Sequence, residues 1–360
     1  FIRQKNVVLY YKYGIIKLLK KGRDKVNNKS KVFFNFGPSH IIVFSFFIVI
    51  IIGTLLLSLP IASKSGESVG IINAMFTSTS AVCVTGLVVV NTFYHWTLFG
   101  KIVILLLIQI GGLGFMSLYT IILVVLGKKI TLKGRILIQE SFNLSTFKGM
   151  VTFLKKIIMV TFSIEGIGAI ILSLRFIPEY GFIGGVFRGV FHSISAFCNA
   201  GFDILGANSL MDYSTDYVIN ITIMILIILG GLGFSVLIDI GRYIKYKIHK
   251  MLNKKVDIFV MTVHSKLALT ITGILLLLGA LLTFIIEYKN PETLLPLRFD
   301  QKILASTFQS VTLRTAGFDA IGQADLNYGS KFLAIILMAI GGSPGGTAGG
   351  IKTVTIGALI

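Results

Sequence analysis

The segment 340–353 reads Ile340-Gly341-Gly342-Ser343-Pro344-Gly345-Gly346-Thr347-Ala348-Gly349-Gly350-Ile351-Lys352-Thr353. It stands where an apolar membrane helix should continue, yet one proline and six glycines fall within ten of its positions. Relative to alanine in a helix, each glycine costs roughly 1 kcal/mol and the proline about 3 kcal/mol. Backbone that leaves the helix at membrane depth is tolerated only where it is buried in protein or lines a water-filled cavity. We therefore predict a pore that a non-helical loop obstructs.

The composition of the 360-residue chain is that of a membrane protein, because 54% of its residues are hydrophobic and only 14% are charged. Its net charge of +19 comes from Lys and Arg clustered in short segments between apolar runs. This pattern is typical of charges that set membrane topology, and it does not indicate a nucleic-acid partner. The apolar runs hold no cluster of His, Asp or Glu that would suggest a membrane-embedded enzyme.

A unit of helix, half-spanning helix with loop, and helix recurs three times. The loop glycines Gly86, Gly201 and Gly317 are separated by 115 and 116 residues. A Gly-Gly pair follows each of them after 25, 29 and 24 residues, and the pairs begin at Gly111, Gly230 and Gly341. We expect an all-α polytopic membrane protein in which these units surround a central pore. We interpret the first two Gly-Gly pairs as sites of close helix packing.

The expected spanning helices are 41–59, 98–126, 151–176, 218–240, 267–286 and 332–340, with a half-helix over 71–84 in the first unit. The connections between units are basic and therefore cytoplasmic, as is the N-terminus, so the half-helices enter from outside. The predicted organisation is a basic cytoplasmic segment (1–38), repeat 1 (39–127), a linker (128–149), repeat 2 (150–241), a linker (242–264) and repeat 3 (265–360). We expect repeat 3 to be truncated, because the chain ends at Ile360 inside an apolar run, and the family resemblance given below implies a fourth repeat beyond Ile360.

The loop glycines suit a selectivity filter, in which backbone carbonyls from several equivalent loops replace the hydration shell of an ion. Each half-helix would direct the negative end of its dipole toward the pore, which favours a cation. The alternative is that these glycines only allow close helix packing, but packing glycines need no polar half-helix before them. The candidate ion-binding residues are Thr85, Gly86, Ala200, Gly201, Ala316 and Gly317.

The motifs Ser80–Leu87, Phe197–Asp203 and Arg314–Asp319, together with Gly341–Lys352, resemble the Trk/Ktr/HKT superfamily of potassium transporters, above all its bacterial KtrB type. The resemblance implies four repeats with one filter glycine each, potassium bound at the filter, and an intramembrane loop that obstructs the pore. It also implies a multi-pass homodimer in the bacterial plasma membrane. A cytosolic nucleotide-binding ring of the KtrA/TrkA type would control it.

The expected function is potassium uptake by a pore-forming subunit, channel-like or symporter. No cofactor is expected besides the transported potassium, with sodium as a further coupling ion. The alternative within transport is a sodium-selective or weakly selective cation pathway of the same fold. A non-conducting sensor or scaffold would not need half-helices that end at repeated glycines.

Several single residues have two interpretations. Lys352 follows glycines as in a phosphate-binding loop, but Ile351 breaks that motif, so it either holds the loop or extends to the inner interface. Arg314 either braces the filter carbonyls or pairs with Asp319. Asp203 and Asp319 either concentrate cations at the outer mouth or are ordinary loop charges. The candidate gate comprises Gly341, Gly342, Ser343, Pro344, Gly345, Gly346, Thr347, Ala348, Gly349, Gly350 and Lys352.

Overall fold

The computed structural model describes residues 38–114, 150–252 and 259–359. The predicted linker 128–149, the N-terminal segment up to residue 37 and the end of the expected helix 98–126 lie outside the described residues. The chain forms two units, Phe1–Ile41 and Ile42–Ile360, and the arrangement below is that of the second. Within the described ranges the regular structure is helical, apart from two single bridge pairs.

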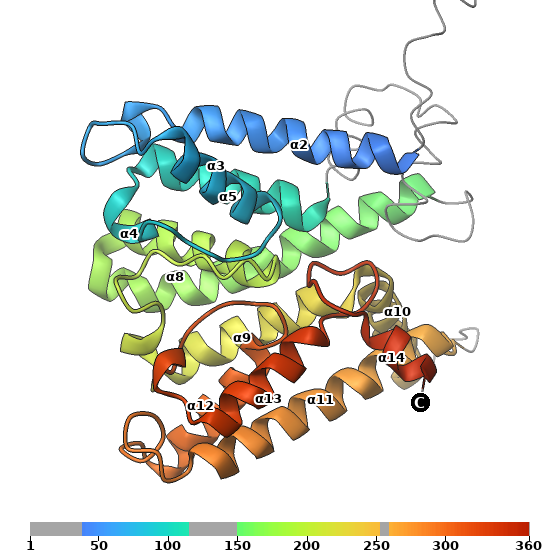
Figure 1. The fold of residues 1–360 in the computed structure, drawn as a ribbon. Helices are drawn as coiled ribbons and strands as arrows, with labels where there is room; N and C mark the ends of the chain where they lie inside the picture. The colour runs from blue at the N-terminus through green and yellow to red at the C-terminus, as the bar shows by residue number, and fades with distance from the viewer. Residues whose placement is uncertain (1–37, 115–149, 253–258, 360) are drawn as a thin grey trace, which may run out of the picture. The chain divides into compact units, whose positions relative to one another are not determined.

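The three expected units are present (Figure 1). The first contains α2 (Pro38–Leu57), the half-helix α3 (Ile71–Val82), the short α4 (Thr92–His95) and α5 (Leu98–Leu113). The second contains α8 (Met150–Phe197), α9 (Tyr217–Leu232) and α10 (Phe234–Met251). The third contains α11 (Val263–Glu287), the half-helix α12 (Phe299–Thr312) and α13 (Tyr328–Ala339), and α14 (Thr353–Leu359) follows the glycine-rich segment. Single 3-10 turns lie at Pro60–Ala62, Met211–Tyr213 and Gln323–Asp325.

The membrane-spanning helices differ from the sequence prediction in the second unit. His40–Leu57, Thr152–Phe197 and Val263–Glu287 are long and apolar enough to cross a membrane. The element α8 contains both the first helix and the half-helix of the unit. The two parts are separated by a kink at Gly181, where φ is +73°. The expected straight helix 218–240 instead breaks at Gly233 (φ +90°), where α9 and α10 meet at 106°. The second part of this helix runs on to Met251, past the predicted boundary at residue 241.

Each half-helix is attached to the first helix of its own repeat in the same way. A serine hydroxyl near the end of the half-helix donates a hydrogen bond to a backbone carbonyl of that first helix. Such a bond holds the half-helix at a fixed height without any charged group in the membrane. The three bonds run from Ser78 to Ile50 (2.8 Å), from Ser193 to Glu165 (2.6 Å) and from Ser310 to Leu276 (2.8 Å).

A glycine makes each of these contacts possible, three residues after the accepting carbonyl. A Cβ atom built on Gly53, Gly168 or Gly279 would lie 2.3, 2.7 or 2.4 Å from the serine oxygen. These distances are too short for any side chain. The first two Gly-Gly pairs also allow close packing, as the sequence predicted: a Cβ on Gly111 or Gly230 would lie 2.1 or 1.8 Å from a carbonyl oxygen at the end of the half-helix.

We predict that Gly168→Ala lowers the melting midpoint of the full-length protein in detergent, because the new methyl group would overlap Ser193 and Leu226. Overpacking of this kind costs about 1–3 kcal/mol. Gly166→Ala in the same helix is the control, because a Cβ there meets no atom within 4 Å. Equal midpoints for the two variants would show that the contact at Gly168 does not limit packing.

Candidate functional site

The three loops that follow the half-helices share one backbone conformation. Each loop glycine has positive φ: +78° at Gly86, +68° at Gly201 and +80° at Gly317. The residue two positions earlier also has positive φ, +55° at Val84, +57° at Asn199 and +62° at Thr315. Positive φ is uncommon outside glycine and is strained for β-branched residues such as valine and threonine. Three copies of one unusual conformation indicate that the loops perform one task.

The three loops meet in chain order. A Cβ atom on Gly86 would lie 2.7 Å from the carbonyl oxygen of Ala200, and one on Gly201 would lie 2.6 Å from that of Ala316. A Cβ on Gly317 would lie 3.4 Å from the Cα of Gly201. The middle loop is therefore buried between its neighbours, whereas Gly317 is exposed. Only glycine fits where backbones approach so closely.

Side-chain hydroxyls at the ends of the half-helices hold these loops. Ser195 donates to the carbonyl of Phe202, and Thr312 donates to the carbonyl of Phe318, each at 2.6 Å. Both acceptors belong to the residue directly after the loop glycine. In the first loop the bond is different, because Ser80 accepts at 2.9 Å from the hydroxyl of Thr85 within the loop itself.

A cavity of about 540 Å³ lies between the first and third loops. Thr85 and Gly317 line it from the two sides, Asp319 lies at its wall, and Thr347 and Gly349 of the glycine-rich segment line it as well. The loops thus form an open ring: the first contacts the second, the second contacts the third, and a cavity separates the third from the first.

The glycine-rich segment folds back on the break in the second repeat. In a continuous helix the carbonyls of Gly230 and Gly231 would accept from residues 234 and 235. Because the helix breaks at Gly233, they accept instead from the backbone N–H groups of Thr347 (3.1 Å) and Ser343 (2.8 Å). The N–H of Phe234 donates in turn to the carbonyl of Gly345 at 2.9 Å.

Two cationic side chains hold the same segment. The buried guanidinium of Arg314 donates to the carbonyl of Gly341 at 2.8 Å and to that of Thr272 at 3.5 Å. Arg314 therefore donates to backbone carbonyls, as one of its two predicted interpretations states. These carbonyls belong to the glycine-rich segment and to α11, whereas the prediction named those of the filter loops. Lys352 donates to the carbonyl of Ala348 at 2.8 Å, within the segment. Both residues lie where they stabilise this non-helical backbone.

The segment also contacts the bases of two of the three loops. The hydroxyl of Thr347 donates to the carbonyl of Phe197 at 2.9 Å, at the end of the second half-helix. The N–H of Gly349 donates at 3.0 Å to the hydroxyl of Thr315, which is one of the positive-φ residues of the third loop. The glycine-rich segment is thus bonded directly beneath the loops.

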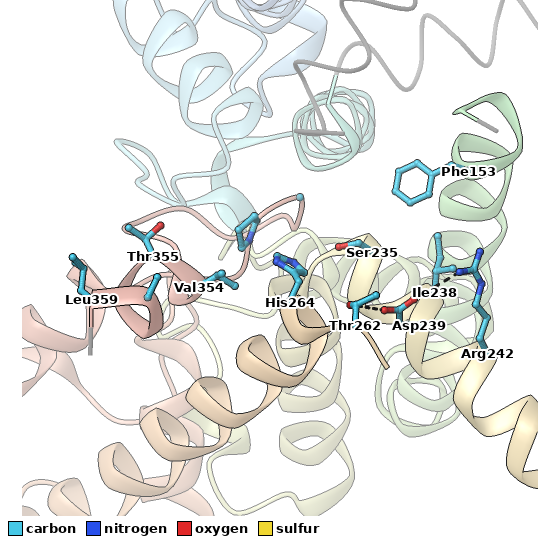
Figure 2. A pocket seen from close by; sticks show the side chains of 13 residues that line it. Phe153, Ser235, Ile238, Asp239, Arg242, Thr262, His264, Val354, Thr355 and Leu359 are labelled. Atoms are coloured by element: carbon cyan, nitrogen blue, oxygen red, sulfur yellow. Dashed lines mark hydrogen bonds and ion pairs between the residues drawn. The ribbon is translucent and has the colours of Figure 1, made fainter. Parts of the chain in front are cut away.

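Other residues of the segment line a second cavity, of about 760 Å³ (Figure 2). Pro344 and Gly345 line this cavity, whereas Thr347 and Gly349 line the first one. The segment therefore stands between the two cavities. The wall of the second cavity is partly polar. The carboxylate of Asp239 accepts hydrogen bonds at 2.8 Å from the hydroxyls of Thr262 and Ser265, and its Oδ1 lies 3.8 Å from Nη1 of Arg242.

The predicted outer-mouth residues Asp203 and Asp319 are half-buried and lie two residues beyond loop glycines. Burial raises the pKa of Asp203 to about 6, although a hydrogen bond with Ser209 opposes the shift. Burial also raises the pKa of Asp319, against a hydrogen bond from Gln323. Burial therefore makes both carboxyl groups easier to protonate than they are in water.

Sequence reasoning missed several residues of this site. It did not identify the positive-φ positions Val84, Asn199 and Thr315, and only the asparagine carries a compositional signal for that conformation. A further contact that the sequence does not reveal joins the buried carboxylate of Glu165 to the amide nitrogen of Gln109, which donates to it at 3.1 Å. Gln109 lies on α5, so this contact joins the first repeat to the second.

A family model described as TrkH, cation transport protein, matches residues 8–360. The chain belongs to the TrkH family of cation transport proteins. It is thus a helical, polytopic membrane transport protein and not an enzyme, as the sequence predicted.

Individual TrkH-family proteins resemble the chain over most of its length. The potassium/sodium uptake protein NtpJ of Enterococcus hirae is 42% identical over 332 residues, which cover 92% of this chain and 70% of that protein. The Ktr system potassium uptake protein B of Bacillus subtilis is 44% identical over 320 residues, which cover 89% of this chain and 68% of that protein. The crystal structure of the potassium transporter TrkH from Vibrio parahaemolyticus shares the fold with a TM-score of 0.61 and 21% identity, covering 87% of this chain and 60% of that one.

We predict that Arg314→Met speeds amide hydrogen exchange in residues 341–351, because the carbonyl of Gly341 loses its charged donor. A hydrogen bond from a charged group contributes about 1.5–3 kcal/mol, so local opening should rise roughly 10- to 100-fold. Arg298→Met, at the exposed start of the same half-helix, is the control and should leave the exchange unchanged. Exchange equal to that of the unmodified protein would mean that Arg314 does not hold the segment.

Proposed function

We propose that this TrkH-family chain is the pore-forming, translocating subunit of a Ktr/Trk-type system for potassium uptake across the plasma membrane. The observation that carries the proposal is the convergence of three loops with one positive-φ conformation. When the sign of φ alternates along a chain, successive carbonyls can face the same side, which lets several loops surround a dehydrated ion. The ends of the half-helices add negative partial charge at the same place.

The open ring supports a fourth loop as part of the working pore. The first and third loops flank the 540 Å³ cavity, and a loop of the same conformation between them would close the ring. In this proposal Thr85, Gly86, Ala200, Gly201, Ala316 and Gly317 contribute carbonyls to potassium sites, and Asp203 and Asp319 attract cations from outside.

The glycine-rich segment 341–350 is proposed as the gate, because it stands between the two cavities. Its bonds to Gly230, Gly231 and Arg314 favour the obstructing position. If it is the gate, weakening these bonds raises the flux, so the Arg314→Met variant should transport faster than the unmodified protein in an uptake assay.

A second candidate is sodium or weakly selective monovalent cation transport. The Enterococcus hirae relative is named a potassium/sodium uptake protein, which favours keeping this alternative. Both candidates use the same filter and gate, and they differ in the spacing of carbonyls around the ion.

The proposed assembly is a homodimer in the lipid bilayer with a cytosolic nucleotide-binding ring, and the proposed N-terminus is cytoplasmic. The basic composition of the connections supports this orientation. The 760 Å³ cavity would then face the cytoplasm, below the gate.

Transport is tested by expressing the complete gene product in a bacterial strain without potassium uptake systems of its own. We expect growth to be restored at low potassium when the cytosolic partner is co-expressed. A protein that inserts normally but restores no growth, and that takes up no labelled rubidium, would contradict the proposed function.

We predict that Gly317→Ser lowers the ratio of potassium to sodium uptake about tenfold, equivalent to roughly 1.4 kcal/mol. Serine is strained at φ +80°, and relief of this strain would turn the neighbouring carbonyls of the loop. Gly66→Ser is the matched control, since Gly66 has φ +76° and open space around it. An unchanged ratio in Gly317→Ser would remove this residue from the filter.

A further inference from the structure

Three cations converge on one aromatic ring near the start of α5. The ammonium nitrogens of Lys101 and Lys64 lie 4.8 and 5.1 Å from the ring centre of Phe93, and the guanidinium carbon of Arg188 lies 5.7 Å from it. The positive charges of Lys64 and Arg188 act on Lys101, and no carboxylate among the described residues offsets them. Like charges held together in a partly buried place repel one another.

Lys64 and Arg188 have further partners. Lys64 donates to the carbonyl of Phe93 at 2.9 Å and is exposed to solvent. Arg188 donates to the carbonyl of Gly184 at 3.3 Å and lies over the ring of Tyr180 at 3.7 Å. Its Nε, however, is buried without a hydrogen-bond partner.

Lys101 is the anomaly of the cluster. It is only 8% exposed, and its ammonium has no hydrogen bond or ion pair with any described residue. An ammonium on so deeply buried a side chain loses much of its hydration, which is costly when no protein group replaces the lost water. Its contact with the ring of Phe93 replaces only part of the lost hydration.

The other two repeats show how the side chain at the position of Lys101 is normally hydrogen-bonded. Ten residues before each Gly-Gly pair stand Lys101, Asn220 and Lys331, each the fourth residue of its helix. Asn220 donates to the carbonyls of Tyr213 and Asp216, both at 2.7 Å. Lys331 donates to the carbonyl of Ala324 at 2.8 Å. The first repeat keeps the donor and lacks the backbone acceptor.

We propose that the cluster of Lys64, Lys101 and Arg188 binds a phosphate group, which supplies the missing acceptor. A phosphate has several anionic oxygens and can accept from all three cations. It comes either from an anionic phospholipid headgroup or from inorganic phosphate. The lipid source fits the position, because Leu98, Ile102 and Leu106 of α5 expose apolar side chains beside the cluster.

The test uses the full-length protein, purified in an uncharged detergent, and two probes. Dihexanoyl phosphatidylglycerol, below its micelle concentration, represents the lipid, and sodium phosphate represents the free anion. Calorimetric titration should show binding of at least one probe. Lys101→Met should weaken that binding about tenfold or more, while Lys101→Arg should retain it.

Lys331→Met is the matched control, because Lys331 occupies the equivalent position and already has an acceptor. It should bind the probe as the unmodified protein does. Because Lys101→Met also removes an uncompensated buried charge, its melting midpoint without probe should equal or exceed that of the unmodified protein. If Lys101→Met fails to fold, the same titration is carried out with Arg188→Gln, which should also bind the probe more weakly.

Binding of phosphatidylglycerol alone would identify a lipid site, and binding of phosphate would identify a site for the free anion. If neither probe binds, or if Lys101→Met binds as tightly as the unmodified protein, the proposal is overturned. Since potassium uptake is measured separately, failure here leaves the proposed transport function untouched.

Discussion

The structure depends on one constraint, which is that backbone polar groups inside a membrane must be hydrogen-bonded within the protein. Two helices are interrupted, at Gly233 and after Ala339, so that backbone groups at each interruption lose their helical partners. Each interruption supplies hydrogen-bond partners for the other. The carbonyls freed at the first break accept from the glycine-rich segment, and the segment accepts from the N–H of Phe234. Neither break would be stable at membrane depth alone. The bend between α9 and α10 and the glycine-rich segment are therefore parts of one arrangement.

The loops above are held by a separate set of bonds. Serines of the half-helices bind the first helix of each repeat, and Ser195 and Thr312 hold the carbonyls that follow the loop glycines. None of these bonds uses the glycine-rich segment. The loops and the segment share only a few contacts, including those of Thr347 with Phe197 and of Gly349 with Thr315. The segment can consequently change its bonds while most of the support of the loops remains.

Sequence alone predicted the three units, the half-helices and the non-helical segment, because apolar run length, proline and repeated glycines report directly on backbone conformation. It did not predict the break at Gly233, because a glycine pair inside an apolar run is equally compatible with close packing of a continuous helix. The expected helix 98–126 is wrong at the equivalent place, since α5 ends at Leu113 and Gly114 has φ +76°. The break at Gly233 is stable only through partners more than a hundred residues away, such as Ser343. The same holds for Arg314, whose acceptor on Gly341 depends on how the third repeat folds back.

The free-energy cost of moving the glycine-rich segment comes from the backbone groups that the movement would leave unpaired. Displacing it would expose the carbonyls of Gly230 and Gly231 and the N–H of Phe234 together. In a dry interior each such group costs about 1–3 kcal/mol when unpaired, but in contact with water each exchange is nearly neutral. The polar cavity on the other side of the segment, with Asp239 and Arg242 in its wall, offers access to water at that point. Hydration of the break at Gly233 therefore lowers the cost of displacing the segment, and the bond from Arg314 to Gly341 adds to that cost.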